Sequence, residues 1–297
     1  MELEALRVVV KVAELGSFTH AATQLGMSKS RVSQLVLELE AELGVLLFQR
    51  TTRVVRPTPD GDQLVLRSRK LVADADEIGA LFQGPRNLKG RVRVDVPTMF
   101  ARTVVLPRLP ELLALHPLLE MEVSATDRRV DVRREGIDCA MRIGVLADES
   151  LVAQRLGVLP MVNVVSPGYA VKYGIPMSCD DLERHFIVHY SATFGGAPAF
   201  EVEVDGLVEE RPMRSLVTVN NIDAYRAACL AGLGIVQVPR YGARELLADG
   251  TLLEVLPQCT CAPMPVALVH GHGRQVPKRV RAVMTWLASL IEPFLGS

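Results

Sequence analysis

The sequence predicts a fold class of three parts in order: an N-terminal winged helix-turn-helix, a linker helix and a two-lobed α/β domain. Three observations predict it. Apolar residues recur at helical spacing before Gly44, a heptad-like pattern follows Pro59, and strands alternate with helices from Arg91 onward. We expect the three parts to span residues 1–58, 59–89 and 90–297, with lobe I at about 90–160 and 266–297 and lobe II at about 161–265.

Composition narrows the class of protein. Hydrophobic residues make up 49% of the 297 residues, so the chain can bury a large core and is not wholly disordered. The net charge of -1 excludes a protein that holds nucleic acid by bulk charge alone. The five cysteines favour a reducing compartment over a disulfide scaffold. The acidic start does not resemble a signal peptide and no stretch is long enough to span a membrane, so we expect a cytoplasmic protein without a membrane partner.

Two short helices are expected at the start of the chain. The apolar residues from Leu3 to Ala13 recur at intervals of three and four, which is typical of an amphipathic helix, and Gly16 interrupts the pattern. Ser17 offers an N-cap for a second helix, which Gly26 ends.

A third helix is expected after Ser28, which would cap it. Together with the second helix it makes a helix-turn-helix, whose polar outward face is of the kind that reads DNA bases. In an arbitrary helix the same polar residues would be only a solvated face. The polar residues are Lys29, Ser30, Ser33 and Gln34, and the apolar residues that face the other way are Val32, Leu35, Val36, Leu39 and Leu43.

The segment from Val45 to Pro57 is expected to form a β-hairpin, in the position of a wing. Its arginines Arg50, Arg53 and Arg56 are groups that phosphates or a narrow minor groove attract. We expect Arg50 and Arg53 to contact DNA ahead of Arg56. The alternative is a charged hairpin that only keeps the protein soluble.

A long helix is expected from Thr58, the N-cap, to about Phe82. Its apolar and small residues recur at heptad spacing, which favours a short coiled-coil-like pairing of two such helices. Gly84-Pro85 and Gly90 then mark a domain boundary. The seam residues are Leu64, Leu71 and Ile78, interleaved with Ser68, Ala75 and Phe82.

The rest of the chain has the alternation of strands and helices that is typical of an α/β domain. We expect the last strand and helix to return to the first lobe, which leaves a cleft between two hinged lobes. Strands are expected near 92–96, 120–124, 139–143, 161–165, 186–189, 216–219, 235–238 and 266–270, and helices near 104–115, 130–135, 222–231 and 278–294.

The N-terminal part of the chain contains a long series of spaced motifs: Leu15-Gly16-Ser17-Phe18-Thr19, Ala21-Ala22, Leu25-Gly26, Ser28, Val32-Ser33, Leu39-Glu40, Leu43-Gly44, Leu47-Phe48, Arg50-Thr51-Thr52-Arg53, Thr58 and Gly61. With these motifs the chain resembles the LysR-type transcriptional regulators, and the resemblance extends over its whole length. The N-terminal match is the more specific part. The looser C-terminal match consists of Asp127-Arg128-Arg129-Val130-Asp131-Val132, Glu135-Gly136-Ile137-Asp138, Arg142-Ile143-Gly144, Ala231-Gly232-Leu233-Gly234-Ile235 and Pro239.

The resemblance implies a cytoplasmic regulator that binds double-stranded promoter DNA as a homodimer or homotetramer. It also implies a periplasmic-binding-protein-like domain that holds a small-molecule effector between its lobes. Arg31 and Gln34 depart from the residues common at these positions in relatives, so the operator sequence is not transferable. The expected DNA contacts are Ser17, Lys29, Ser30, Arg31, Ser33, Gln34, Arg50, Thr51 and Arg53.

The effector contacts are expected around the carboxyl ends of strands, where α/β domains open their ligand crevices. The resemblance also implies an effector contact at the segment that starts with Thr98, and a pocket lining in the region of Arg128. Thr98 is equally well interpreted as a helix N-cap, and Arg128 as a solvated arginine. The arginines favour an organic acid as the effector. The candidates are Thr98, Met99, Phe100 and Arg128 in lobe I, and His189, Ser191, Thr193 and Asn220 in lobe II.

Two alternatives remain open at this point. The first is a redox- or metal-responsive regulator acting through Cys259 and Cys261, with His270 and His272 nearby in sequence. The second is a small-molecule enzyme whose N-terminal helices only dimerise. The common enzyme motifs are missing from the sequence, however. The nearest match, Gly232-Leu233-Gly234, lacks the third glycine of a dinucleotide-binding loop. We therefore expect no enzyme activity, no cofactor and no bound metal.

Overall fold

The computed structural model describes residues 1–50, 55–80, 88–144, 151–191, 194–273 and 276–296. The chain forms two compact units, Met1–Gly90 and Arg91–Ser297. Among the described residues, no helix combines the length and the apolar character that crossing a membrane requires.

The first unit begins with the three expected helices: α1 (Leu3–Leu15), α2 (Phe18–Leu25) and α3 (Lys29–Leu43). The expected caps are confirmed. The hydroxyl of Ser17 accepts a hydrogen bond from the N–H of His20 at 3.3 Å, and that of Ser28 accepts one from Arg31 at 3.2 Å. The apolar face of α3 is buried except at Leu43, which is 41% exposed. The core therefore ends before Leu43, the last residue of the helix.

The wing consists of β1 (Phe48–Arg50) and β2 (Val55–Pro57). The two strands pair antiparallel with Phe48 opposite Pro57, which confirms the expected hairpin. Phe48 is buried and its ring meets that of Phe18 edge-on at 5.9 Å between centroids. The hairpin is thereby attached to the core of the helical domain.

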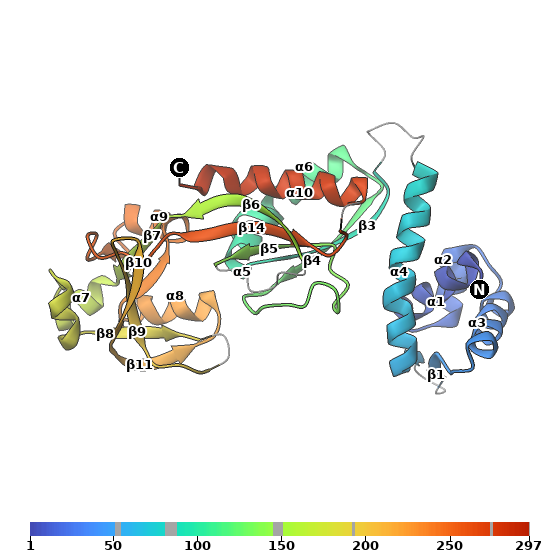
Figure 1. Cartoon of the computed structure of the whole chain (residues 1–297), viewed down its shortest axis with the longest axis horizontal. Helices are drawn as coiled ribbons and strands as arrows, with labels where there is room; N and C mark the ends of the chain where they lie inside the picture. The colour runs from blue at the N-terminus through green and yellow to red at the C-terminus, as the bar shows by residue number, and fades with distance from the viewer. Residues whose placement is uncertain (51–54, 81–87, 145–150, 192–193, 274–275, 297) are drawn as a thin grey trace. The chain divides into compact units, whose positions relative to one another are not determined.

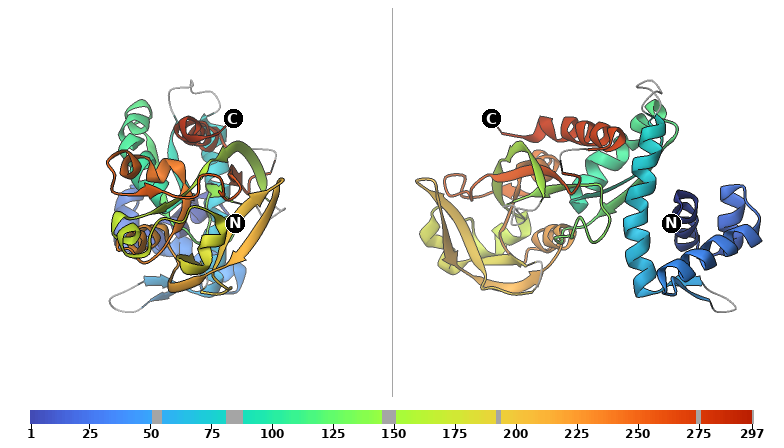
Figure 2. Two further views of the ribbon diagram at one scale, coloured as in Figure 1. Left: turned by 90° about the vertical axis from the view of Figure 1, so that its left-hand side faces the viewer. Right: turned by 45° about the vertical axis from the view of Figure 1, so that its right-hand side comes forward.

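The linker helix α4 (Pro59–Ala80) starts where Thr58 caps it and packs against α1 (Figure 2). The residues of its predicted seam differ in exposure: those of the N-terminal half pack against the helical domain, and two further along are exposed to solvent. Leu64 packs against the core of the helical domain and Ser68 is 1% exposed, so neither is available for pairing as predicted. Leu71 and Ile78 are 49% and 65% exposed. Phe82 lies outside the described residues.

Lobe I of the second unit is a five-stranded sheet with covering helices: β3 (Gly90–Val96), α5 (Thr98–Phe100), η1 (Ala101–Val105), α6 (Leu106–Leu115), β4 (Leu119–Ala125), β5 (Cys139–Ile143), β6 (Val152–Leu159), β14 (Met264–His270), α10 (Lys278–Ile291) and η3 (Glu292–Phe294). The strand order is β4-β3-β5-β14-β6. Figure 1 shows α6 and α10 on one face of the sheet, where Val105, Val283 and Leu287 belong to one buried cluster. The four strands expected here are confirmed, and β6 is an additional strand.

The helix expected near 130–135 is wrong. These residues form a single turn, in which the N–H of Glu135 donates to the carbonyl of Asp131 at 2.9 Å. The carboxylate of Asp131 accepts from the N–H groups of Arg133 and Arg134, and Gly136 ends the turn with a left-handed φ of 65°. A turn closed by its own side chain leaves no room for further helical turns.

The described residues of lobe II form three small sheets and four helical segments: β7 (Met161–Val165), α7 (Pro167–Tyr173), η2 (Cys179–Arg184), β8 (Phe186–Tyr190), β9 (Ala199–Val204), β10 (Leu207–Pro212), β11 (Arg214–Val219), α8 (Ile222–Leu230), β12 (Val236–Pro239), α9 (Arg240–Ala248) and β13 (Leu253–Glu254). The sheets pair β12-β7-β13, β11-β8 and β10-β9. The four strands and the helix expected in this lobe are confirmed. The hairpin of β9 and β10 was not expected from the sequence.

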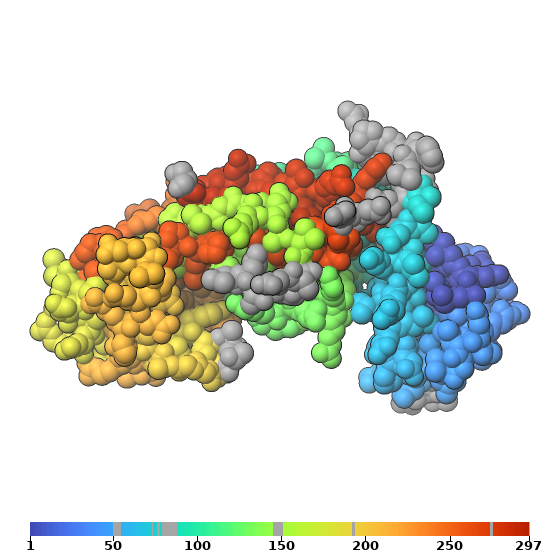
Figure 3. Space-filling model, viewed as in Figure 1, coloured from blue at the N-terminus to red at the C-terminus, as the bar shows by residue number. Residues whose placement is uncertain are grey.

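The chain passes between the lobes twice, at Pro160 before β7 and again between β13 and β14. The expected return of the last strand and helix is confirmed, because β14 pairs with β5 and β6 of lobe I. Figure 3 shows the yellow and orange surface of lobe II adjoining the green and red surface of lobe I.

Candidate nucleic-acid interface and ligand cleft

The first turns of α3 present the polar face expected from the sequence. Lys29, Ser30, Arg31 and Gln34 are exposed, and Ser33 is half-buried on the same part of the helix. Ser17, the cap of α2, is half-buried. The structure therefore brings together the predicted helical contacts on one accessible surface.

The side chains of this face differ in how they are held. The guanidinium of Arg31 lies 3.1 Å from the carboxylate of Glu4 on α1, and the amide of Gln34 donates to Glu38 at 2.8 Å. Within the part of the chain that the structure describes, Lys29 makes no hydrogen bond or ion pair. Arg31 and Gln34 are therefore held by acids of the same domain, whereas Lys29 is not.

The wing is only partly described. Arg56 on β2 is exposed. Thr51 and Arg53 lie outside the described residues, and of Arg50 only the backbone, in β1, is described.

A buried acid for which the sequence predicted no contact fixes the start of the wing. Glu40 is 7% exposed, and its Oε1 accepts hydrogen bonds from the N–H groups of Leu47 at 2.8 Å and Phe48 at 3.2 Å. Glu40 follows Val36 by four residues, which places it on the buried face of α3. This spacing is the feature of the sequence from which the burial of Glu40 could have been predicted. Its two hydrogen bonds make Glu40 a positioning residue for the hairpin.

Close backbone packing also joins the wing to α4. The hydroxyl of Thr58 donates to the carbonyl of Leu46 at 2.6 Å and accepts from the N–H of Gly61 at 3.0 Å. A Cβ on Gly61 would lie 2.0 Å from the carbonyl oxygen of Leu47. Only glycine permits this approach of the helix to the hairpin.

In the second unit, a cavity of about 1130 Å³ opens between the two lobes. Three of the expected effector contacts line it: Met99, Arg128 and His189. Thr193 lies outside the described residues. The remaining candidates, Thr98, Phe100, Ser191 and Asn220, are not part of its lining.

The candidates that do not line the cavity have other contacts. Phe100 is completely buried in the core of lobe I. The hydroxyl of Ser191 donates to the carbonyl of Gly195 and accepts from its N–H, both at 2.8 Å. Asn220 is exposed, and the cap of α8 is its neighbour Asn221. Thr98 is not an N-cap either, because that position belongs to Pro97 and makes no side-chain cap.

Two arginines that line the cavity, Arg128 and Arg142, are paired with acids. Arg142 lies 2.7 Å from Asp95, a completely buried carboxylate that also accepts from the hydroxyls of Ser124 and Thr126. Arg128 makes two 3.0 Å hydrogen bonds to Glu135, and these raise the pKa of the arginine and lower that of the acid. Neither positive charge is left without a counter-charge.

An acid of the cavity forms a bridge between the lobes. One carboxylate oxygen of Asp127 accepts from the N–H of Thr98 in lobe I at 2.9 Å, and the other accepts from the N–H of Ile222 in lobe II at 2.8 Å. A second link, between Arg102 and Asp223 at 3.0 Å, is exposed to solvent.

Two further acids line the cavity from lobe II. Glu201 on β9 lies directly opposite Glu210 on β10. Partial burial, and then the charge of Glu210, raise the pKa of Glu201. Like charges opposite each other weaken a strand pair, so these positions contribute negative charge to the cleft at a cost in stability.

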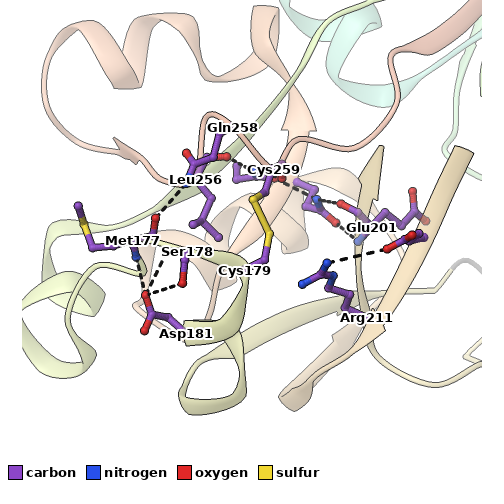
Figure 4. The surroundings of a disulfide bond; sticks show 12 residues. Met177, Ser178, Cys179, Asp181, Glu201, Arg211, Leu256, Gln258 and Cys259 are labelled. Atoms are coloured by element: carbon purple, nitrogen blue, oxygen red, sulfur yellow. Dashed lines mark hydrogen bonds and ion pairs between the residues drawn. A yellow bond between two sulfur atoms is a disulfide. The ribbon is translucent and has the colours of Figure 1, made fainter. Parts of the chain in front are cut away.

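The cysteines do not combine as the redox or metal alternative assumed. Cys259 forms a disulfide with Cys179, shown in Figure 4, and not with Cys261. Burial raises the pKa of the Cys261 thiol to about 12, so it is not a reactive thiolate. Among the described residues, no group of three or more potential ligands is arranged to hold a metal ion.

A glycine motif of lobe II has a packing role. A Cβ on Gly234 would lie 2.7 Å from the backbone nitrogen of Val188, so the glycine allows β8 and the chain before β12 to approach. Close backbone packing therefore accounts for the second glycine of Gly232-Leu233-Gly234, and no dinucleotide-binding role is needed to explain it.

A winged helix-turn-helix joined to a two-lobed domain with a cleft defines a class of ligand-responsive DNA-binding proteins. Comparison with known families agrees: residues 3–62 match the bacterial regulatory helix-turn-helix protein family, lysR type, and residues 85–291 match the LysR substrate binding domain. The chain belongs to the LysR-type transcriptional regulators. The matched families are those of transcriptional regulators and not of enzymes.

Individual relatives support the family over the full length. The chain is 40% identical over 296 residues to the uncharacterized HTH-type transcriptional regulator YhjC of Escherichia coli, covering 99% of each chain. It is 34% identical to an HTH-type transcriptional repressor of Pseudomonas aeruginosa, covering 97% of this chain and 92% of the relative. The solved structure of CrgA, a LysR-type regulator from Neisseria meningitidis, is 27% identical with a TM-score of 0.60, covering 97% of this chain and 98% of that one.

Proposed function

We propose that this transcriptional regulator reads its operator with the first turns of α3 in the major groove, while the wing holds the phosphate backbone beside it. The observation that supports this is the exposed polar face of α3, next to a hairpin that Glu40 and Thr58 fix to the same domain. Lys29 would contact a guanine or a phosphate, and Gln34 an adenine. Ser30, Ser33 and Arg31 would add contacts to the backbone.

We propose further that α4 pairs two copies of the chain. Leu71 and Ile78 are exposed apolar residues seven positions apart, which is one heptad. Their exposure in a single chain is accounted for if a second α4 covers them. Paired helices would set the distance between two operator half-sites, as expected of a homodimer or of a tetramer built from dimers. A DNA-bound regulator of this kind would act in the cytoplasm.

The cleft between the lobes is the proposed effector site, because its cavity of about 1130 Å³ exceeds the volume of an ordinary metabolite. The sequence expectation of an organic acid rested on arginines near the cleft. Arg128 and Arg142 are both paired with acids, so they give that class of effector no particular support. An effector would act by favouring one arrangement of the two lobes over another.

The DNA-binding proposal is tested by titrating full-length protein against its own upstream DNA at several salt concentrations. We expect Lys29→Ala to weaken specific binding about tenfold and to reduce the salt dependence by about one ion. The matched control is Lys172→Ala, which removes an exposed lysine from α7 in the second unit. Equal losses for the two variants would contradict a specific role for the α3 face.

The pairing of α4 is tested by sedimentation of Leu71→Asp and Ile78→Asp. We expect both variants to shift the protein toward monomers, because an aspartate in an apolar seam leaves a buried charge. Val171→Asp is the control, since Val171 is 90% exposed on α7. Unchanged association of both α4 variants would mean that the oligomer forms elsewhere.

A further inference from the structure

The two hydrogen bonds of Asp127 connect backbone groups that are far apart in the sequence. Thr98 follows β3 in lobe I, and Ile222 is the first residue of the nine-residue helix α8 in lobe II. Each oxygen of the Asp127 carboxylate serves one of these N–H groups, at 2.9 and 2.8 Å. Asp127 itself is half-buried and lines the cavity between the lobes.

The position of this carboxylate is one that a bound anion would otherwise fit. Two N–H groups from opposite walls of a cleft point at one negatively charged group, and one of them belongs to the positive end of a helix. Hydrogen bonds to an ionised acceptor are stronger than those between neutral groups. In this chain the carboxylate of Asp127 is the acceptor, so the N–H groups of Thr98 and Ile222 are already hydrogen-bonded and do not bind a carboxylate ligand.

The other contacts do not replace this bridge. Arg102 and Asp223 also link the lobes, but their side chains are 54% and 47% exposed, and an ion pair in water contributes little. The arginines Arg128 and Arg142 are held by Glu135 and Asp95 on their own lobe. The ring of Tyr241 on α9 also packs against Phe100 and Phe294 of lobe I, at 6.4 and 5.4 Å between centroids, but this contact is apolar. Among the described residues, the half-buried polar link between the two walls of the cleft is therefore the one made by Asp127.

We propose that Asp127 is a built-in carboxylate that holds the two lobes together and excludes carboxylate ligands from the position between Thr98 and Ile222. The inference rests on the proposed function of the cleft as the effector site and deepens it. The effector of this regulator therefore makes its contacts elsewhere in the cleft. Asp127 is thus a specificity-determining residue.

The lobe bridge is tested by hydrogen–deuterium exchange of the full-length protein without DNA or effector. We expect Asp127→Ala to speed exchange about tenfold or more in two segments, around Thr98 and around Ile222. The matched control is Asp131→Ala, since Asp131 also accepts from two N–H groups, those of Arg133 and Arg134, but within one lobe. This control should affect only its own turn.

Asp127→Asn guards against a folding defect, because it keeps the size of the side chain and one acceptor oxygen. We expect it to retain protection in one of the two segments and to lose it in the other. Unchanged exchange around Ile222 in both Asp127 variants would overturn the bridge. Hydrogen–deuterium exchange is measured here without DNA. A failure of the lobe bridge can therefore be distinguished from a failure of the proposed operator contacts.

The exclusion of carboxylates is tested by adding acetate. We expect millimolar acetate to restore protection around Thr98 and Ile222 in Asp127→Ala, and to leave the wild-type protein unchanged. Acetate that fails to restore protection in the variant would overturn the assignment of an anion position. Acetate that protects the same segments further in the wild type would show that Asp127 does not occupy it.

Discussion

The carboxylate of Glu40 on α3 accepts the backbone N–H of Leu47 at 2.8 Å, at the start of the wing. The helix proposed to enter the major groove and the hairpin proposed to lie beside it are therefore connected through one buried acid. Leu47 is completely buried, so its N–H has no access to water as an alternative acceptor. The placement of the wing depends on this residue.

Glu40→Ala should destabilise the first unit by about 2 kcal/mol, because it leaves the N–H groups of Leu47 and Phe48 buried without this acceptor. DNA affinity should fall with it, while Glu40→Gln, which keeps an acceptor oxygen, should lose less. Thermal unfolding followed by circular dichroism measures the effect. Glu42→Ala is the control on the same helix, and a loss as large as that of Glu40→Ala would refute the role of burial.

Gly61→Ala should destabilise the protein by about 3 kcal/mol, because its methyl group would overlap the carbonyl oxygen of Leu47. Gly168→Ala is the matched control, since Gly168 lies in α7 and a Cβ there meets no atom within 4 Å. The control should be neutral or slightly stabilising. Urea unfolding compares the two variants, and equal stability would mean that the wing does not approach α4 so closely.

Reduction of the bond between Cys179 and Cys259 should destabilise lobe II by on the order of 4 kcal/mol, because the bond closes a long loop of sequence separation 80. Thermal unfolding with and without dithiothreitol measures this effect. Cys179→Ser should be as unstable as the reduced protein and should not respond to dithiothreitol. A variant that still responds would place the bond between other cysteines.

Glu201→Gln should raise the thermal stability of the protein at neutral pH. The pKa of Glu201 is raised in the folded state, so folding favours its protonated form and loses stability as the pH rises above the ordinary value of 4.5. The advantage of the glutamine should therefore shrink as the pH falls below that value. Glu203→Gln on the same strand is the control, because Val208 and not an acid lies opposite it. A gain that persists unchanged in acid would contradict a charge effect.

The elements with strong periodicity were predictable, because local pattern and caps agree with the fold. The helices of the first unit follow from apolar spacing, and the hydroxyls of Ser17 and Ser28 cap α2 and α3 as expected. The hairpin of β9 and β10 also has a local sequence signal, since Asp205-Gly206 is a dipeptide typical of tight hairpin turns, and both residues have positive φ.

The candidate effector site was less predictable, because its chemistry depends on long-range contacts. The end of a strand predicted Thr98 as an effector contact. In the structure its backbone N–H donates a hydrogen bond to Asp127, which is 29 residues away in the sequence. Phe100 was expected in the cleft because it follows a strand, yet helical geometry turns it into the core. Pairing of Cys179 with Cys259 likewise joins distant residues that no local pattern connects.

Recognition of a specific operator by α3 and the wing is tested most directly by a nuclease footprint of the full-length protein on its own upstream intergenic DNA. We predict a protected region with two symmetric half-sites, lost in the double variant Lys29→Ala and Gln34→Ala while circular dichroism shows an intact fold. Absence of any protected site at low salt from a folded, oligomeric protein, or a footprint that the double variant leaves unchanged, would contradict the account.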